Sequence, residues 1–191
     1  MAAETAYRSL EILRVKAGHM LMLHGAGTTV GFAAVRLALM RGARVVASAG
    51  DTYAPQLREF GATVTAYGNG IVERVRAIVG GPPDLILDTA PPSGVLPDLV
   101  RIADGDPRRV LTVVDFATAK ELGVRDGFGE DTTLRYDMLD EFARWAVEGR
   151  LVVPIARTFA LDEWDQAREI SQSWHARGKL VLLPGGLAAG D

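Results

Sequence analysis

The sequence predicts an α/β fold in which a doubly wound parallel sheet is covered by helices on both faces. Two observations support this class. Short apolar runs that suit buried strands alternate with helical patterns along most of the chain, and the connections between them are short. A glycine-containing turn at residues 24–31 also joins the first apolar run to a segment that is apolar almost all round, as in a buried helix. Residues 20–51 therefore predict a first βαβ unit, which is typical of nucleotide-binding sheets.

The elements are placed by apolar periodicity and by the residues that interrupt it. Strands are expected where short apolar or β-branched runs end at a turn, at residues 20–23, 44–48, 62–66, 84–88 and 109–115. Helices are expected where apolar residues recur at helical spacing, at residues 2–14, 30–40, 53–60, 71–79 and 95–103. Gly42 and Gly61 end two of these helices, and the Gly-Gly-Pro-Pro run at 80–83 ends a third.

The pattern changes after Gly123. Residues 126–133 are rich in glycine and aspartate, which predicts an exposed loop. An amphipathic helix is expected at 136–148, and its inward residues are Leu139, Phe142 and Trp145 or Ala146. Residues 151–155 predict an edge-like strand, because Pro154 interrupts them.

The last part of the chain predicts a helix and a strand that extend the main fold. The helix, at 161–174, carries an apolar stripe that is expected to be core, formed by Leu161, Trp164, Ala167, Ile170 and Trp174. The strand is expected at 179–183. The chain is accordingly divided into a nucleotide-binding domain at 1–150, a C-terminal return at 151–184 and a tail at 185–191.

Composition excludes several classes of protein. The 191 residues are 48% hydrophobic, and a net charge of −3 with scattered Lys and Arg argues against a nucleic-acid partner. The absence of cysteine excludes disulfides and zinc-thiolate sites, and His19, His24 and His175 are too dispersed to predict a metal site. No apolar run reaches the roughly 20 residues of a membrane span, and the N-terminus is unlike a secretory signal. A cytoplasmic protein without a bound metal is expected.

The first turn provides the physical case for a nucleotide. Backbone N–H groups at a helix N-terminus carry partial positive charge and lack helical partners, so a pyrophosphate can accept hydrogen bonds from them. Gly25, Gly27 and Gly31 are spaced one residue too long for a dinucleotide fingerprint. With Gly31 as the third position, Ala26 and Thr28 replace the first two glycines. The alternative is a helix-entry turn in which glycine serves packing alone.

The ends of later strands supply further candidates, because ligands of open α/β sheets bind outside the carboxyl ends of strands. Ala49 occupies the position where an acidic residue would bind the ribose of NAD, which favours NADP, although Asp51 lies two residues later. The residues expected to line a nicotinamide pocket are Asp88, Thr89, Ala90, Val114, Asp115 and Phe116. Turn capping is an equally open role for Asp88 and for Asp115. His24 is expected to be a strand-end residue rather than a catalytic acid.

Several segments follow one another in a recognisable order, namely AETAYRSLE, HGAGTTVGFAAVRLA, GARVVAS, EFGATVTAYG, DLILDTA, RVLTVVDF and VPIARTFALDEWDQAREISQSWHARGKLVLLP. Their order and spacing over residues 3–184 resemble the cofactor-binding lobe and C-terminal return of the medium-chain dehydrogenase/reductase superfamily. Within that superfamily they look most like the zinc-independent, quinone oxidoreductase-like branch.

This resemblance implies a Rossmann-type domain that binds NADP, or alternatively NAD, for hydride transfer to a small-molecule quinone, enone or carbonyl. The residues implied at the pyrophosphate are Gly27, Thr28, Thr29, Val30 and Gly31, and those at the adenosine ribose are Ser48, Ala49, Gly50 and Tyr67. The Thr28 hydroxyl would donate to the phosphate, or its methyl group would crowd the site. Tyr67 matches a tyrosine of NADP sites in this branch, whereas Ala54 stands where those sites place a lysine.

The resemblance also implies an N-terminal barrel-like lobe that lies outside this sequence. Residues 151–184 would belong to that lobe, so the isolated chain is expected to lack a complete active site, and no catalytic residue is identified. The alternative function is a non-catalytic Rossmann module that mediates assembly. The resemblance implies homodimers formed through sheet edges, and residues 151–155 are the candidate edge strand.

Two other nucleotide-dependent classes are excluded by their motifs. A short-chain reductase requires Tyr-x-x-x-Lys, and none of the tyrosines is followed by lysine at that distance. A P-loop NTPase requires Gly-Lys-Ser/Thr after the turn, which is absent. A methyltransferase stays open as a remote alternative, because Asp51 lies near the end of the second strand.

Overall fold

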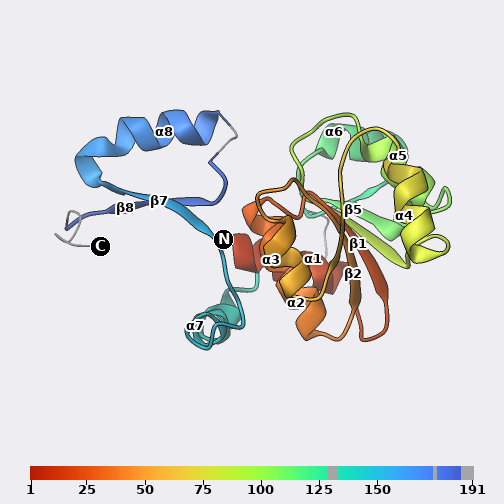
Figure 1. The fold of residues 1–191 in the computed structure, drawn as a ribbon, viewed down its shortest axis with the longest axis horizontal. Helices are drawn as coiled ribbons and strands as arrows, with labels where there is room; N and C mark the ends of the chain where they lie inside the picture. The colour runs from red at the N-terminus through yellow and green to blue at the C-terminus, as the bar shows by residue number, and fades with distance from the viewer. Residues whose placement is uncertain (129–132, 174–175, 186–191) are drawn as a thin grey trace. The chain divides into compact units, whose positions relative to one another are not determined.

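A computed structural model describes residues 1–128, 133–173 and 176–185 of the chain. The chain divides into two units, Met1–Val152 and Val153–Asp191 (Figure 1). None of the helices within the described residues is long and apolar enough to cross a bilayer.

The first unit is built on a six-stranded parallel sheet with the order β3-β2-β1-β4-β5-β6. Its strands are β1 (Met20–His24), β2 (Arg44–Ser48), β3 (Thr63–Thr65), β4 (Leu85–Asp88), β5 (Val110–Thr112) and β6 (Arg125–Asp126). The chain runs outward from β1 to β3 and then returns to pair β4 with the other side of β1. This reversal creates a switch point between β1 and β4, where open α/β sheets bind ligands. The predicted doubly wound parallel sheet is confirmed.

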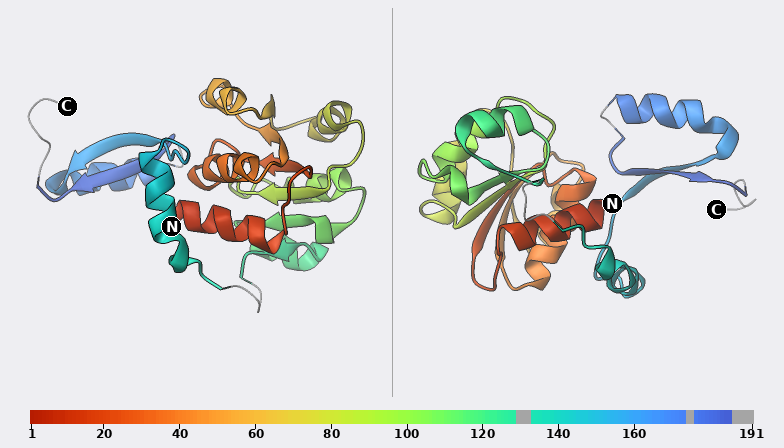
Figure 2. Two further views of the ribbon diagram at one scale, coloured as in Figure 1. Left: turned by 90° about the horizontal axis from the view of Figure 1, so that it is seen from below. Right: turned by 180° about the vertical axis from the view of Figure 1, so that it is seen from behind.

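Helices cover both faces of this sheet, as Figure 2 shows. They are α1 (Ala2–Ile12), α2 (Thr29–Met40), α3 (Ala54–Glu59), α4 (Ile71–Val79), α5 (Leu96–Ile102), α6 (Phe116–Leu122) and α7 (Leu139–Val147). Short 3-10 turns at Pro107–Arg109 (η1) and Tyr136–Met138 (η2) precede β5 and α7. Helices α4 and α5 bury one face against Met22, Val46 and Ile86 of the central strands. Phe32 of α2 and Leu10 of α1 are fully buried in the same unit.

The end of β5 differs from the prediction. Residues 113–115 are not strand, because the Thr112 side chain accepts hydrogen bonds from the amides of Val114 (3.3 Å) and Asp115 (3.2 Å) and so bends the chain away. Asp115 then caps α6 by accepting from the Thr118 amide at 3.2 Å. Helix α6 and the two-residue strand β6 were not predicted. Of the predicted loop at 126–133, residues 129–132 lie outside the described residues.

The second unit contains β7 (Ile155–Ala160), a 3-10 turn at Leu161–Glu163 (η3), α8 (Trp164–Gln172) and β8 (Lys179–Leu183). Strands β7 and β8 form a parallel pair. The strand predicted at 151–155 is wrong, because residues 151–154 are irregular and β7 begins directly after Pro154, which has no N–H to donate. The candidate dimer strand is lost with it.

Two predicted core stripes are only partly buried. Ala167 of α8 is buried, whereas Trp164 of α8 is 49% exposed and Leu161, in the preceding turn η3, is 53% exposed. Trp174 lies outside the described residues. On α7, Phe142 is buried but Leu139 is 50% exposed. The prediction that these stripes are core is therefore wrong for Leu161, Trp164 and Leu139, because α8 covers a sheet of only two strands and α7 packs through a single buried ring.

Candidate functional site

The candidate site begins at the turn between β1 and α2. The turn is closed by a hydrogen bond from the Thr28 amide to the Gly25 carbonyl (3.0 Å), and the Ala26 amide donates to the Ser48 carbonyl of β2 (3.0 Å). Gly25 has a φ of +78°, which favours glycine. The turn therefore lies over the ends of β1 and β2, beside the switch point between β1 and β4.

Three backbone amides of this turn have no hydrogen-bond acceptor among the residues that the structure describes. Thr28 caps α2, because its hydroxyl oxygen accepts from the Gly31 amide at 3.0 Å. Within the described part of the chain, no acceptor bonds the amides of Gly27, Thr29 and Val30. These donors lie in the first turn of α2, where the helix dipole favours an anion. The turn can therefore bind a phosphate through its backbone.

The two glycines that flank this helix start serve different purposes. A Cβ atom on Gly31 would lie 2.3 Å from the Gly25 carbonyl oxygen and 2.6 Å from the Thr89 hydroxyl oxygen, so glycine is required there for packing. A Cβ atom on Gly27 would meet only the Tyr53 ring, at 3.6 Å, and the φ of Gly27 is not positive. Packing thus explains Gly31, and it leaves Gly27 without a structural reason to be glycine.

Thr89 ties the turn to the end of β4. Its hydroxyl lies 3.0 Å from both the His24 and the Gly25 carbonyl oxygens and accepts from the Thr28 hydroxyl at 3.1 Å. Thr89 is 4% exposed, so its side chain supports the turn from below. Because Thr28 donates to Thr89, its hydroxyl is already engaged inside the protein. The predicted role of either residue at a bound cofactor stays a prediction.

His24 and Ser48 join the ends of β1 and β2. The Ser48 hydroxyl lies 2.7 Å from His24 Nδ1, and both residues are buried. Burial lowers the pKa of His24 to about 4, so the ring is neutral at pH 7. The Gly25 amide also donates to the Ser48 oxygen, at 3.4 Å. This pair holds the strand ends beneath the turn.

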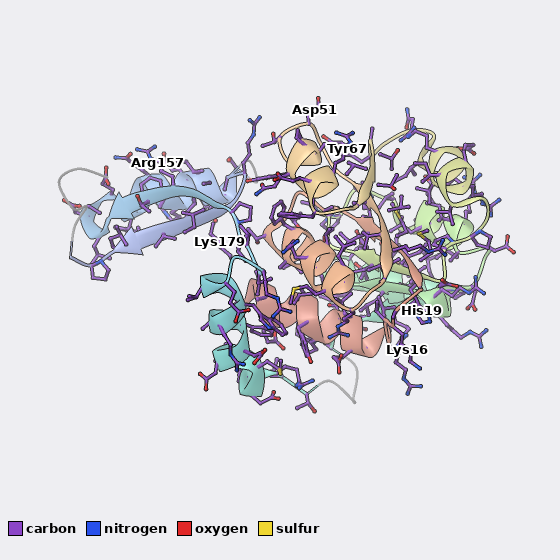
Figure 3. The ribbon with its side chains drawn as sticks, turned by 60° about the horizontal axis from the view of Figure 1, so that its bottom comes forward. Lys16, His19, Asp51, Tyr67, Arg157 and Lys179 are labelled. Carbon is purple, nitrogen blue, oxygen red and sulfur yellow. The ribbon has the colours of Figure 1, made fainter. Side chains whose placement is uncertain are left out.

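The structure brings two of the predicted ribose residues together. A Cβ atom on Gly50 would lie 3.5 Å from Tyr67 Cε1 and 3.7 Å from its hydroxyl oxygen, so the ring of Tyr67 lies beside the chain that follows β2. Tyr67 is 63% exposed, and Asp51 is also exposed at this end of the unit (Figure 3). Ala49 is buried, and its amide donates to the Thr65 carbonyl of β3 at 3.1 Å.

The carboxyl ends of β4 and β5 contain a buried acid. Asp88 accepts from the Thr112 hydroxyl at 2.8 Å and from the Ala90 amide at 3.2 Å. Burial raises the pKa of Asp88 to about 6, although these hydrogen bonds oppose the shift. Nearby, the exposed ring of Phe116 meets that of Phe128 edge-on, with centroids 5.2 Å apart. Phe128 was not predicted as a site residue. Its only signal in the sequence is that it is an aromatic residue within the predicted exposed loop at 126–133.

A family model described as zinc-binding dehydrogenase matches residues 60–182, which is more than half of the chain. No curated protein matches the chain by sequence.

Solved structures share the fold over 95% of this chain. A quinone oxidoreductase from Coxiella burnetii is 24% identical with a TM-score of 0.73, and this chain covers 58% of it. An alcohol dehydrogenase superfamily protein from Novosphingobium aromaticivorans is 23% identical with a TM-score of 0.77 and 61% covered. A putative alcohol dehydrogenase from Sinorhizobium meliloti is 26% identical with a TM-score of 0.75 and 53% covered. The chain thus spans 53% to 61% of the length of these structures.

The described residues do not fit a zinc site. In the ranges that the structure describes, no group of three or more His, Cys, Asp or Glu side chains lies together. The sequence also contains no cysteine, the ligand that zinc prefers in structural sites. No chemistry is therefore assigned to a metal held by this chain.

Replacement of Gly31 and Gly27 by alanine should affect stability very differently. Gly31→Ala should lower the free energy of unfolding by about 2 kcal/mol or more, because its methyl group overlaps the Gly25 carbonyl and Thr89. Gly27→Ala should stay within about 0.5 kcal/mol of the unmodified chain. Urea unfolding followed by circular dichroism measures both. Equal losses for the two variants would refute this assignment of the two glycines.

The buried Asp88 should shape the pH dependence of stability. Its pKa is about 6 in the folded chain against 3.8 unfolded, so proton uptake by the folded state adds stability as the pH falls from 6 to 4. His24 acts in the opposite direction, because its pKa falls from 6.5 to about 4 on folding and the unfolded state takes up the proton. The two contributions offset one another in the unmodified chain.

Asp88→Asn should remove the contribution of Asp88, which stabilises the folded chain as the pH falls, and leave the opposing contribution of His24. Between pH 7 and pH 4 the variant should lose up to about 3 kcal/mol more unfolding free energy than the unmodified chain. Urea unfolding at several pH values checks this difference. Parallel pH profiles for the two proteins would show that Asp88 does not titrate as described.

Proposed function

The chain belongs to the zinc-binding dehydrogenase family, within the medium-chain dehydrogenase/reductase superfamily that its motifs resemble, and from this premise we propose that its first unit binds a nicotinamide dinucleotide for hydride transfer. The proposal extends to a cytoplasmic oxidoreductase that acts as a homodimer on a small-molecule quinone, enone or carbonyl. It also assigns residues 151–184 to a lobe outside this chain, which completes the active site.

One observation carries the proposal, namely the three unpaired amides of Gly27, Thr29 and Val30 at the start of α2. A diphosphate can accept from these donors, and the dipole of the twelve-residue helix adds to the attraction. The absence of a side chain at Gly27 supports the same conclusion, because a Cβ atom there would meet only the Tyr53 ring, at 3.6 Å, yet would stand between a ligand and the backbone.

The adenosine end supports NADP over NAD. No carboxylate occupies position 49, where an acid would accept from the ribose of NAD and repel a 2′-phosphate. The Tyr67 hydroxyl lies beside Gly50 and can donate to a phosphate. Asp51 is the feature that would favour NAD, since it lies exposed at the same end.

The nicotinamide, when bound, supplies the hydride, and this chain orients it. Ala90, Val114, Asp115 and Phe116 follow the strand ends beside the switch point and would line its pocket. Phe116 would cover the ring with its exposed side chain. Asp88 is not assigned a proton-transfer role, because its carboxylate is already bonded to Thr112 and Ala90.

Titration of the whole chain with NADPH and NADH by calorimetry tests the proposal. NADPH should bind with release of heat and more tightly than NADH. The absence of heat with both nucleotides would overturn the proposal.

Gly27→Ala should weaken NADPH binding about tenfold or more, because the added methyl group stands where the diphosphate approaches. Its unfolding free energy should stay within about 0.5 kcal/mol of that of the unmodified chain. Gly81→Ala is the matched control, since Gly81 has open space around it, has no positive φ and lies in the loop before β4. Unchanged affinity in Gly27→Ala would remove Gly27 from the binding site.

A further inference from the structure

The loop between β3 and α4 presents Tyr67 in an unusual way. Residues 66–70 turn sharply, and Gly68 and Gly70 have φ values of +83° and +77°. Tyr67 is 63% exposed, and its hydroxyl has no hydrogen-bond partner among the described residues. The position of this ring therefore depends on the backbone that carries it.

Arg74, in the first half of α4, holds that backbone. Its Nη1 donates to the Asn69 carbonyl at 2.6 Å. Its Nη2 faces the carbonyl oxygens of Ala66 (3.0 Å), Tyr67 (3.3 Å) and Gly68 (3.4 Å). One guanidinium group thus gathers the carbonyl oxygens of four consecutive residues.

Two further observations indicate that the loop and the guanidinium are fitted to each other. A Cβ atom on Gly70 would lie 3.0 Å from Arg74 Nη1, so a larger residue would disturb the contact. The Nε group of Arg74 is buried and has no acceptor within the described chain. A buried N–H without an acceptor costs free energy. Because the guanidinium of Arg74 tolerates this cost at Nε, its orientation is determined by the contacts of Nη1 and Nη2 with the loop.

We propose that Arg74 is a positioning residue that favours the dinucleotide with a 2′-phosphate by holding Tyr67 beside Gly50, an inference that rests on the proposed function. The Tyr67 hydroxyl can donate to a phosphate, and a fixed hydroxyl loses less conformational freedom on binding than a mobile one. The cationic guanidinium of Arg74 lies against the same loop and favours the more negative ligand. Lysine would retain the charge, but it lacks the planar fork that spans several carbonyl oxygens.

Calorimetric titration of Arg74→Lys with NADPH and with NADH tests this role. NADPH affinity should fall about tenfold while NADH affinity changes less than about twofold, because the loop is released and the charge is kept. Arg76→Lys is the matched control, because Arg76 lies on the same helix but contacts Arg101 and Asp104 near α5. Equal losses for both nucleotides would overturn the proposal in favour of a purely structural role.

A double-mutant cycle shows whether Arg74 acts through Tyr67. Tyr67→Phe removes the hydroxyl and should itself weaken NADPH binding. In that background, Arg74→Lys should cost less than about twofold in NADPH affinity, because the group that it positions is gone. Additive losses would overturn the proposal.

Amide hydrogen exchange separates this inference from the proposed function. In Arg74→Lys without any nucleotide, the amides of residues 67–70 should exchange faster, whereas those of β1 should not change. If the unmodified chain binds neither nucleotide, the proposed function fails and the selective role of Arg74 fails with it. If nucleotide binds but exchange in the loop is unchanged, only the positioning role is overturned.

Discussion

The close approach of the β1–α2 turn to the end of β4 is the constraint on which the site depends. Gly31 must lack a side chain because the Gly25 carbonyl and the Thr89 hydroxyl occupy the space beside it. Thr89 fastens this contact with hydrogen bonds to the turn, and the buried His24–Ser48 pair holds the strand ends below. Helix α2 therefore begins at a fixed height above the sheet, with its first amides at the switch point.

Fixing the helix start in this way decides which donors face outward. The Thr28 hydroxyl oxygen accepts a hydrogen bond from the Gly31 amide, so one of the free N–H groups at the start of α2 is satisfied by the chain itself. Three others have no acceptor in the described chain, and nothing in the packing requires Gly27 to lack a side chain. A protein that only needed a stable helix end could have capped more of them. The turn is better explained as a preformed anion site at which little reorganisation accompanies binding.

Much of the fold could be predicted from the sequence, because β1, β2 and β4 at the centre of the sheet are short, mostly apolar runs that follow or precede a turn. Predictions failed where side chains changed the backbone locally, as at Thr112, which ends β5 early. They also failed where burial depends on what covers a helix, as for Leu161 and Trp164. Within the site, the turn was predictable, but the different roles of Gly27 and Gly31 depend on distances to residues far along the chain. Arg74 belongs to no motif, and only its contacts with four carbonyl oxygens indicate a role.

The central claim is that backbone amides at the start of α2 bind a dinucleotide diphosphate. The most direct measurement is a series of ¹H–¹⁵N correlation spectra of the labelled chain recorded during titration with NADPH. The amide resonances of Gly27, Thr29 and Val30 should move downfield as these groups gain an acceptor, whereas that of Gly31 should change little because Thr28 already bonds it. Saturable binding that leaves these three resonances in place would contradict the account.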